Sequence, residues 1–145
     1  MKITIEHTDL EENEVILKCS ALDDEMLRVL ALLRSDMQKL LVWNDNRETL
    51  PLSVSKVIYC ETMEDKTFVY TQDGMFQTAL SLAEIEDHWS DLGLFRVGKS
   101  SIVNLHEIHK LKNCGAGRIE ALLSTGEKLI ISRHYAPMLR EKLGM

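Results

Sequence analysis

The spacing of apolar residues in the first part of the chain predicts two strands followed by a helix. Isoleucines alternate with polar residues over Lys2–Glu6, and three apolar residues follow one another within Glu14–Cys19, so each segment is expected to be a strand. A helix is expected from about Ser20 to Ser35, with a start at Ser20–Asp23 that resembles a capping box. Its apolar stripe, at three- and four-residue spacing, consists of Leu22, Met26, Val29, Leu33, Met37 and Leu40.

Short strands separated by turn residues dominate the chain from residue 51 onward. Gln72–Gly74 and Thr125–Gly126 are typical hairpin turns, because glycine adopts a positive φ at no steric cost. Ser81–Glu84 forms a capping box that predicts a short helix, and Ala136–Pro137 predicts the start of the last helix. The expected strands are Val54–Cys60, Thr67–Thr71, Met75–Leu80, Phe95–Val97, Ile102–Leu105, Ile108–Leu111, Ile119–Leu123 and Lys128–Ser132.

These elements predict a mainly β fold with a few helices, of the α+β class. A β-rich domain is expected over residues 51–145, behind an N-terminal β/α segment over residues 1–50 that could serve dimerisation or regulation. The two helices of the β-rich domain are expected to pack on the sheets through Leu82, Ile85 and Trp89 and through Met138, Leu139 and Leu143.

Length and composition place the chain among ordinary globular proteins. It has 145 residues, of which 45% are apolar and 28% charged. No apolar run approaches the length of about 18 residues that a membrane span needs, and the first residues carry acids instead of the apolar core of a signal peptide. Cys19, Cys60 and Cys114 form no CxxC pair, which fits reduced thiols. We therefore expect a cytoplasmic protein.

The net charge of -6 hides a gradient along the chain. Residues 1–50 and 51–95 have net charges of -5 and -6, whereas residues 96–145 carry nine basic and four acidic residues, a net charge of +5. Such an asymmetry is compatible with a surface that binds a polyanion, but charge alone favours a solvated basic surface that has no function.

No pattern in the chain predicts a catalytic or metal site. His106 and His109 are three residues apart, and on a strand their side chains would point to opposite faces, which argues against zinc. Glu61, Glu64 and Asp65 have no second group of acids to work with, and no nucleotide-binding glycine motif is present. We therefore expect a protein that is not an enzyme and needs no cofactor or metal, and a small hydrolase is the least supported class.

Three clusters of hydrogen-bond donors suit nucleic acid. The stretch Phe95–Asn104 places two cations and two serines around Gly98, where a turn can approach a duplex closely. Ser132–Tyr135 ends a strand and precedes a helix, and Lys66–Thr67 begins a hairpin strand. Within the first stretch, Asn104 is expected to tie a turn of the backbone.

At this point the sequence resembles the LytTR family of bacterial DNA-binding domains. The motifs that carry the resemblance stand in order along the chain. They are Val-Ile-Tyr-Cys-Glu at Val57–Glu61, the strand Thr67–Thr71, Phe-Arg-Val-Gly-Lys-Ser-Ser-Ile-Val-Asn at Phe95–Asn104, and the Ser-Arg ending of Gly126–Arg133. Together they cover about residues 50–145, and four ordered motifs are far more specific than any one of them.

The resemblance implies an elongated stack of β-sheets that inserts loop side chains, rather than a recognition helix, into successive major grooves on one side of the duplex. By motif position, the residues that contact bases are Lys66, Lys99 and Arg133, of which the two lysines stand at positions that vary in the family. Arg96, Ser100, Ser101 and His134 are implied to contact the DNA backbone, although Arg96 could instead pair with an acid on a neighbouring strand.

The first 50 residues are too short for the receiver domain of well-known relatives, so control by aspartyl phosphorylation is not expected. The chain looks like the small stand-alone members, which often work with a membrane protein, and this implies a membrane-protein regulator as a further partner. The helix over Ser20–Ser35 could pack on the chain's own sheets or on a second chain, and we expect a homodimer. The expected function is a sequence-specific transcriptional regulator. The alternative is a protein-interaction module that keeps the fold but binds a protein partner instead of DNA.

Overall fold

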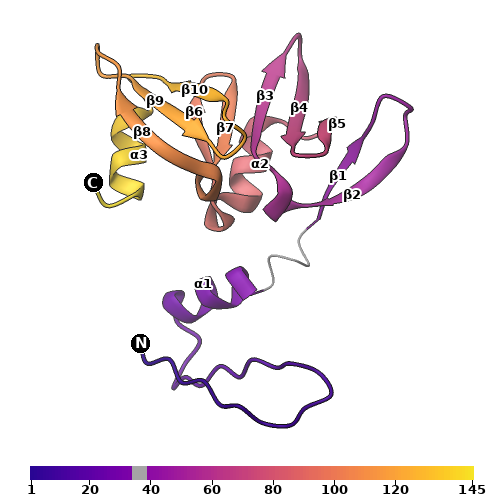
Figure 1. Cartoon of the computed structure of the whole chain (residues 1–145), viewed down its shortest axis with the longest axis vertical. Coiled ribbons are helices and arrows are strands. Elements are labelled where there is room, and N and C mark those ends of the chain that lie inside the picture. The colour runs from indigo at the N-terminus through magenta and orange to yellow at the C-terminus, as the bar shows by residue number, and fades with distance from the viewer. Residues whose placement is uncertain (34–38) are drawn as a thin grey trace.

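Two antiparallel β-sheets and three α-helices make up the described part of the chain, residues 1–33 and 39–145 of a computed structural model (Figure 1). The first sheet has the strand order β2-β1-β5-β4-β3-β7-β6, and the second has the order β10-β9-β8. The strands of the first sheet are β1 (Lys39–Trp43), β2 (Thr49–Ser53), β3 (Tyr59–Met63), β4 (Lys66–Thr71), β5 (Gly74–Thr78), β6 (Leu94–Gly98) and β7 (Ser101–Asn104). Those of the second are β8 (Ile108–Asn113), β9 (Ile119–Leu123) and β10 (Lys128–Ile131).

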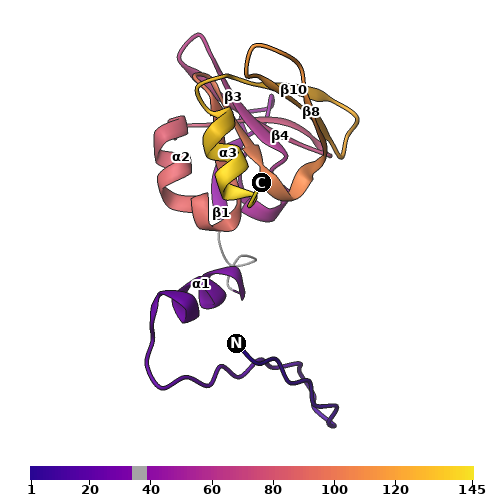
Figure 2. The ribbon, with the colours of Figure 1, turned by 90° about the vertical axis from the view of Figure 1, so that its left-hand side faces the viewer.

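The helices are few and short, so the predicted mainly β fold class is confirmed. They are α1 (Asp24–Leu33), α2 (Leu82–Trp89) and α3 (Ala136–Lys142), with single 3₁₀ turns η2 (Val54–Lys56), η3 (Ser90–Leu92) and η4 (Leu105–Glu107). Figure 2 shows α2 beside the sheets and α3 in front of them, with α1 below. No helix of the described residues is long and apolar enough to cross a membrane.

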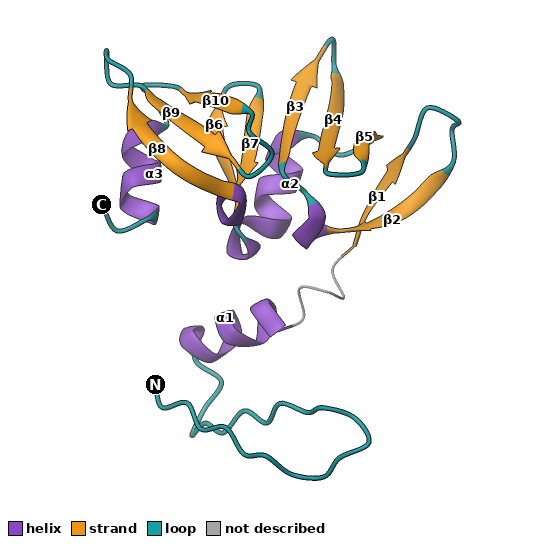
Figure 3. Cartoon of the chain, in the orientation of Figure 1, coloured by secondary structure: helices purple, strands orange, loops and turns teal. Residues whose placement is uncertain are grey.

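The N-terminal strands expected over Lys2–Glu6 and Glu14–Cys19 are not formed. Residues 1–23 run as a loop without regular structure, coloured teal in Figure 3. The side chains of Ile3 and Ile5 are 83% and 78% exposed. A strand needs a neighbouring strand to satisfy its backbone groups, and a five-residue alternation with two isoleucines buries too little apolar surface to recruit one.

Helix α1 begins later than the sequence pattern predicts. Its first turn is capped by Asp23, whose Oδ1 accepts a hydrogen bond from the backbone N–H of Met26 at 2.9 Å, so Ser20 does not start it. Of the predicted apolar stripe, Met37 lies outside the described residues, as does the expected helix end at Ser35. Leu40 belongs to strand β1, where it is fully buried.

The hairpin of β1 and β2 was not among the elements expected from the sequence, and Pro51 lies in its second strand. β2 is an edge strand that pairs only with β1, so the missing N–H of Pro51 costs no ladder bond to a second neighbour. The Oδ1 of Asn44 accepts hydrogen bonds from the backbone N–H groups of Asn46 and Glu48 and shapes the turn. The division between residues 50 and 51 therefore falls within a strand of the first sheet.

The predicted strands of the β-rich domain are confirmed to within two residues at either end, with one exception. The segment predicted as a strand over Val54–Cys60 begins with the 3₁₀ turn η2, and β3 starts only at Tyr59. This turn lets Val54 and Val57, three residues apart, be buried in the same core, whereas on a strand their side chains would point to opposite faces. Ile58 is buried in a second core.

The β6–β7 hairpin separates two hydrophobic cores. Leu94 and Ile102 face the core that the first sheet shares with α2, whereas Val97 and Val103 face the core that the second sheet shares with α3. In α2 the predicted capping box is present, and Leu82, Ile85 and Trp89 are buried as expected.

Only part of the predicted packing of α3 is formed. Leu139 is fully buried together with Ala136, three residues before it on the same helix face. Met138 and Leu143 are 44% and 41% exposed, because Met138 lies on another face of the helix and Leu143 follows its last residue.

Asn104, the last residue of β7, links the residue Val57, which precedes β3, to His106, which follows β7. Its Nδ2 donates to the carbonyl oxygen of Val57 at 2.8 Å, and its Oδ1 accepts from the N–H of His106 at 3.1 Å. The side chain is buried, so each of these groups would be left without a partner if the amide were removed. As expected, the Asn104 side chain ties the backbone together.

We expect Asn104→Ala to lower the free energy of unfolding by about 1–3 kcal/mol, because the buried carbonyl of Val57 loses its donor. Urea denaturation followed by circular dichroism measures this change. Asn46→Ala is the matched control, since the Asn46 side chain is exposed, and its effect should stay within about 0.5 kcal/mol. Equal stability of the two variants would contradict the role given to Asn104.

Candidate nucleic-acid interface

The first candidate residue, Lys66, stands at the tip of the β3–β4 hairpin. Met63 and Lys66 form the last pair of the two strands, and the turn between them consists of Glu64 and Asp65 alone. Both turn residues have a positive φ, of 51° and 65°, as a two-residue turn of this hand requires. The hairpin therefore presents an exposed lysine directly beside two exposed carboxylates.

The second candidate, Lys99, lies in the turn between β6 and β7, where both it and Ser100 are exposed. Arg96 holds this turn from within. Its Nε donates to the carbonyl oxygen of Gly98 at 2.9 Å, and its Nη2 donates to that of Lys99 at 2.6 Å. A Cβ at Gly98 would lie 2.9 Å from the Oγ of the half-buried Ser101, so a larger residue there would require the serine side chain to shift.

The third group, Arg133 and His134, lies between β10 and α3, and both side chains are exposed. The stem of Arg133 runs over Gly117 in the β8–β9 hairpin, where a Cβ would lie 2.8 Å from the Cγ of the arginine. The ring of His134 stands edge-on to that of Tyr135, with ring centres 4.9 Å apart. The arginine is thus supported by backbone from a second hairpin.

Two backbone hydrogen bonds connect these three turns. The N–H of Thr62, near the tip of the β3–β4 hairpin, donates to the carbonyl oxygen of Ser100 at 2.9 Å. The N–H of Ser132 donates to the carbonyl oxygen of Val97 at 3.1 Å. The β6–β7 turn is therefore tied to the Lys66 hairpin on one side and to the Arg133 segment on the other. Both hairpin turns and the N-terminal end of α3 lie along the upper edge of the sheets in Figure 1.

Lys66 and Lys99 share one open groove of about 740 Å³ with Arg96 and Ser100. Side chains of Asp65 and Glu84 also line it, so its charge is mixed. Arg133 and His134 are not part of this groove. The structure thus brings together the predicted residues of the first two turns and places those of the third beside them on the same edge.

A pair of tyrosines on the first sheet reaches the second sheet through one of its members, Tyr59. The rings of Tyr59 in β3 and Tyr70 in β4 stack with centres 4.2 Å apart, and the hydroxyl of Tyr70 donates to Glu61 at 3.3 Å. Burial and a hydrogen bond to Glu127 raise the pKa of Tyr59 above its usual value. The neutral hydroxyl thus links β3 to the β9–β10 turn, and residue spacing along the chain could not have revealed this partner.

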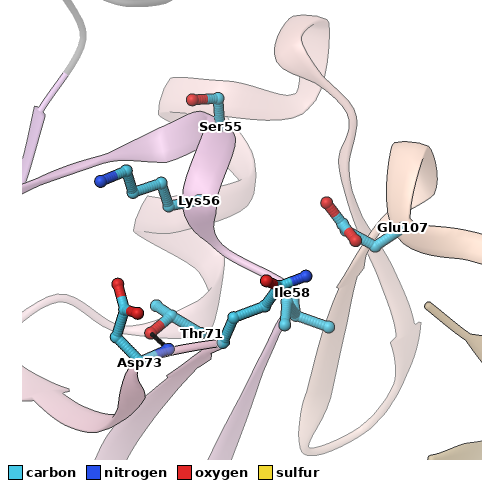
Figure 4. Close-up of a pocket in the computed structure, with 7 residues that line it drawn as sticks. Ser55, Lys56, Ile58, Thr71, Asp73 and Glu107 are labelled. Carbon is cyan, nitrogen blue, oxygen red and sulfur yellow. Dashed lines mark hydrogen bonds between the residues drawn. The ribbon is translucent and has the colours of Figure 1, made fainter. Parts of the chain in front are cut away.

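A separate pocket of about 240 Å³ lies at the opposite ends of strands β3 and β4 (Figure 4). It is bounded by η2, the β4–β5 turn and η4, and its charged side chains are Lys56, Asp73 and Glu107. Glu107 accepts a hydrogen bond from the hydroxyl of Ser124, which engages one of its oxygens. Lys56, the last residue of η2, is therefore an exposed lysine that lies away from the three turns.

The described residues contain no cluster of His, Cys, Asp and Glu that could hold a metal ion. Burial raises the pKa of the Cys60 thiol to about 12, so it stays protonated at neutral pH and is a core residue rather than a nucleophile. Neither observation offers a reaction centre, and the basic turns remain the strongest candidate site.

Comparisons with known proteins identify the family of most of the chain. The family model of the LytTr DNA-binding domain matches residues 47–144. Among solved structures, the chain is similar to the LytTr DNA-binding domain of a protein from Bacillus cereus described as a putative methyl-accepting/DNA response regulator, with a TM-score of 0.70 and 25% sequence identity. The similarity covers 74% of this chain and 99% of that one. The search of curated proteins found no match.

Proposed function

The chain belongs to the LytTR family of DNA-binding domains, and from this we propose that it is a transcriptional regulator that recognises a specific DNA sequence through three turns. The observation that carries the proposal is the pair of backbone hydrogen bonds, from Thr62 to Ser100 and from Ser132 to Val97. They fix Lys66, Lys99 and Arg133 along one edge, as contact with successive major grooves on one side of a duplex requires.

In this proposal Lys66, Lys99 and Arg133 contact base edges. An arginine or lysine suits the O6 and N7 acceptors of guanine in the major groove, and the fork of an arginine can bind both at once. The residues proposed to contact phosphates are Arg96, Ser100, Ser101 and His134. Ser101 is half-buried, so its hydroxyl is less accessible to a phosphate than that of Ser100.

The carboxylates beside Lys66 affect how its turn would approach DNA. Glu64 and Asp65 would be repelled by phosphates, so we place the tip of this hairpin at the bases, where a carboxylate can accept a hydrogen bond from the amino group of cytosine. Attraction to the DNA backbone would then come mainly from residues 96–145, which have a net charge of +5.

We expect the full chain to bind a duplex selected from a randomised pool with a strong dependence on salt. Each phosphate contact releases counterions, so about 4–7 contacts give a slope of log K against log salt of about -4 to -6. Fluorescence anisotropy of the labelled duplex measures the affinity.

Alanine at Lys66, Lys99 or Arg133 should lower the affinity for that duplex by about 1–3 kcal/mol, whereas Lys56→Ala should change it little. Lys56 is a matched control because it is equally exposed but lies at the opposite end of the sheet. A slope near zero, or an equal loss in all four variants, would contradict the proposed function.

We further propose that two copies of the chain associate through α1. The helix lies close to η3, yet Leu27, Leu32 and Leu33 each remain about half exposed. Figures 1 and 2 place α1 and the residues before it below the sheets, away from the basic turns. A second copy could cover these leucines without blocking DNA, and linking two modules strengthens binding to paired half-sites. A membrane-protein regulator remains the competing occupant of this face.

Sedimentation of the full chain at micromolar concentration tests the association. We expect a dimer, and we expect Leu27→Glu together with Leu32→Glu to give a monomer that still binds a single half-site. The matched control is Leu41→Glu, a leucine in strand β1 that is 64% exposed and lies outside the helix, which should remain dimeric. A monomeric wild-type chain, both free and on the full site, would contradict the proposed dimer.

A further inference from the structure

The backbone of the β6–β7 turn is held by donors from inside the protein. Three successive carbonyl oxygens, those of Gly98, Lys99 and Ser100, all accept hydrogen bonds. Arg96 supplies the first two donors at 2.9 and 2.6 Å, and the N–H of Thr62 supplies the third at 2.9 Å. One side chain thus fixes two peptide groups on either side of the Lys99 Cα.

Arg96 is itself held in place at its backbone. Its N–H donates to the Oε2 of Glu86 in α2 at 2.9 Å. The pairing of β6 with β7 shifts by one residue between Arg96 and Gly98, which is a β-bulge at Val97. Bulges redirect neighbouring side chains, and here the side chain of Arg96 runs along its own turn toward Lys99.

We infer that Arg96 is a positioning residue that sets the direction of Lys99, an inference that rests on the proposed function of the three turns. The guanidinium group has five N–H donors in a rigid plane, and two of them are used on the turn. A lysine at position 96 would keep the charge but lack the planar fork. Contact with a phosphate through the remaining donors needs only charge, so the two roles can be separated by experiment.

The first test needs no DNA. In the free full-length protein, Arg96→Ala and Arg96→Lys should both increase the fast motion of the Lys99 and Ser100 amides, measured as lower order parameters by ¹⁵N relaxation. Lys56→Ala is the control and should leave these amides unchanged. Unchanged order parameters in both Arg96 variants would overturn the inference even if the chain binds DNA as proposed.

The second test uses the selected duplex and a duplex changed at the base pair whose recognition is lost in Lys99→Ala. We expect Arg96→Ala and Arg96→Lys each to reduce discrimination between these duplexes by about tenfold, and to reduce it no further when combined with Lys99→Ala. Thermal melting confirms that each variant is folded, and Arg96→Lys keeps the test open if the alanine variant is not.

A different result would show that Arg96 only contacts phosphate. If Arg96→Ala weakens both duplexes alike and Arg96→Lys restores the affinity, Arg96 is only a phosphate contact and the inference is wrong. If the wild-type chain binds no duplex selectively, the proposed function fails, and the relaxation measurement still decides whether Arg96 orders the turn.

Discussion

Burial of the β6–β7 hairpin on both faces is the constraint on which the rest of the structure depends. Leu94 and Ile102 pack into one core, and Val97 and Val103 pack into the other. The two sheets cannot shift relative to one another without opening one of these cores, and close-packed interiors resist such movement. The hairpin therefore sets the spacing between the Lys66 turn on the first sheet and the Arg133 segment after the second.

The outer edge of β6 connects the buried hairpin to the turns at the surface. An edge strand exposes unpaired backbone groups, and here Glu86 accepts from the N–H of Arg96 while the N–H of Ser132 reaches the carbonyl oxygen of Val97. Both contacts lie immediately before the turn that carries Lys99. The Ser132 contact, which protects the sheet edge, thus also ties the Lys99 turn to the Arg133 segment.

Much of this arrangement could be predicted from the sequence, because the patterns involved are local. The Ser81 capping box, the glycine-containing turns and the alternating strands from residue 66 onward depend on neighbouring residues alone. β2 was missed because Pro51 is acceptable only on an edge strand, and strand order is not visible in the sequence. The strands predicted in the first 20 residues were wrong for the opposite reason: the alternating pattern is present, but no neighbouring strand pairs with it.

For the candidate site, the sequence motifs named residues but did not predict how the structure arranges them. Motif order alone singled out Lys66, Lys99 and Arg133, whereas the engagement of Arg96 with its own turn depends on a bulge that no spacing rule predicts. The Tyr59–Glu127 contact joins residues far apart in the chain and likewise could not be predicted from the sequence.

Protection of guanine N7 from methylation on the selected duplex tests the central claim most directly, because N7 lies in the major groove. The account predicts protected guanines in successive major grooves about 10 base pairs apart on one side of the duplex. Arg133→Ala should expose guanines in one of these grooves only. Protection confined to a single groove, or none despite tight binding, would contradict recognition by three turns held along one edge.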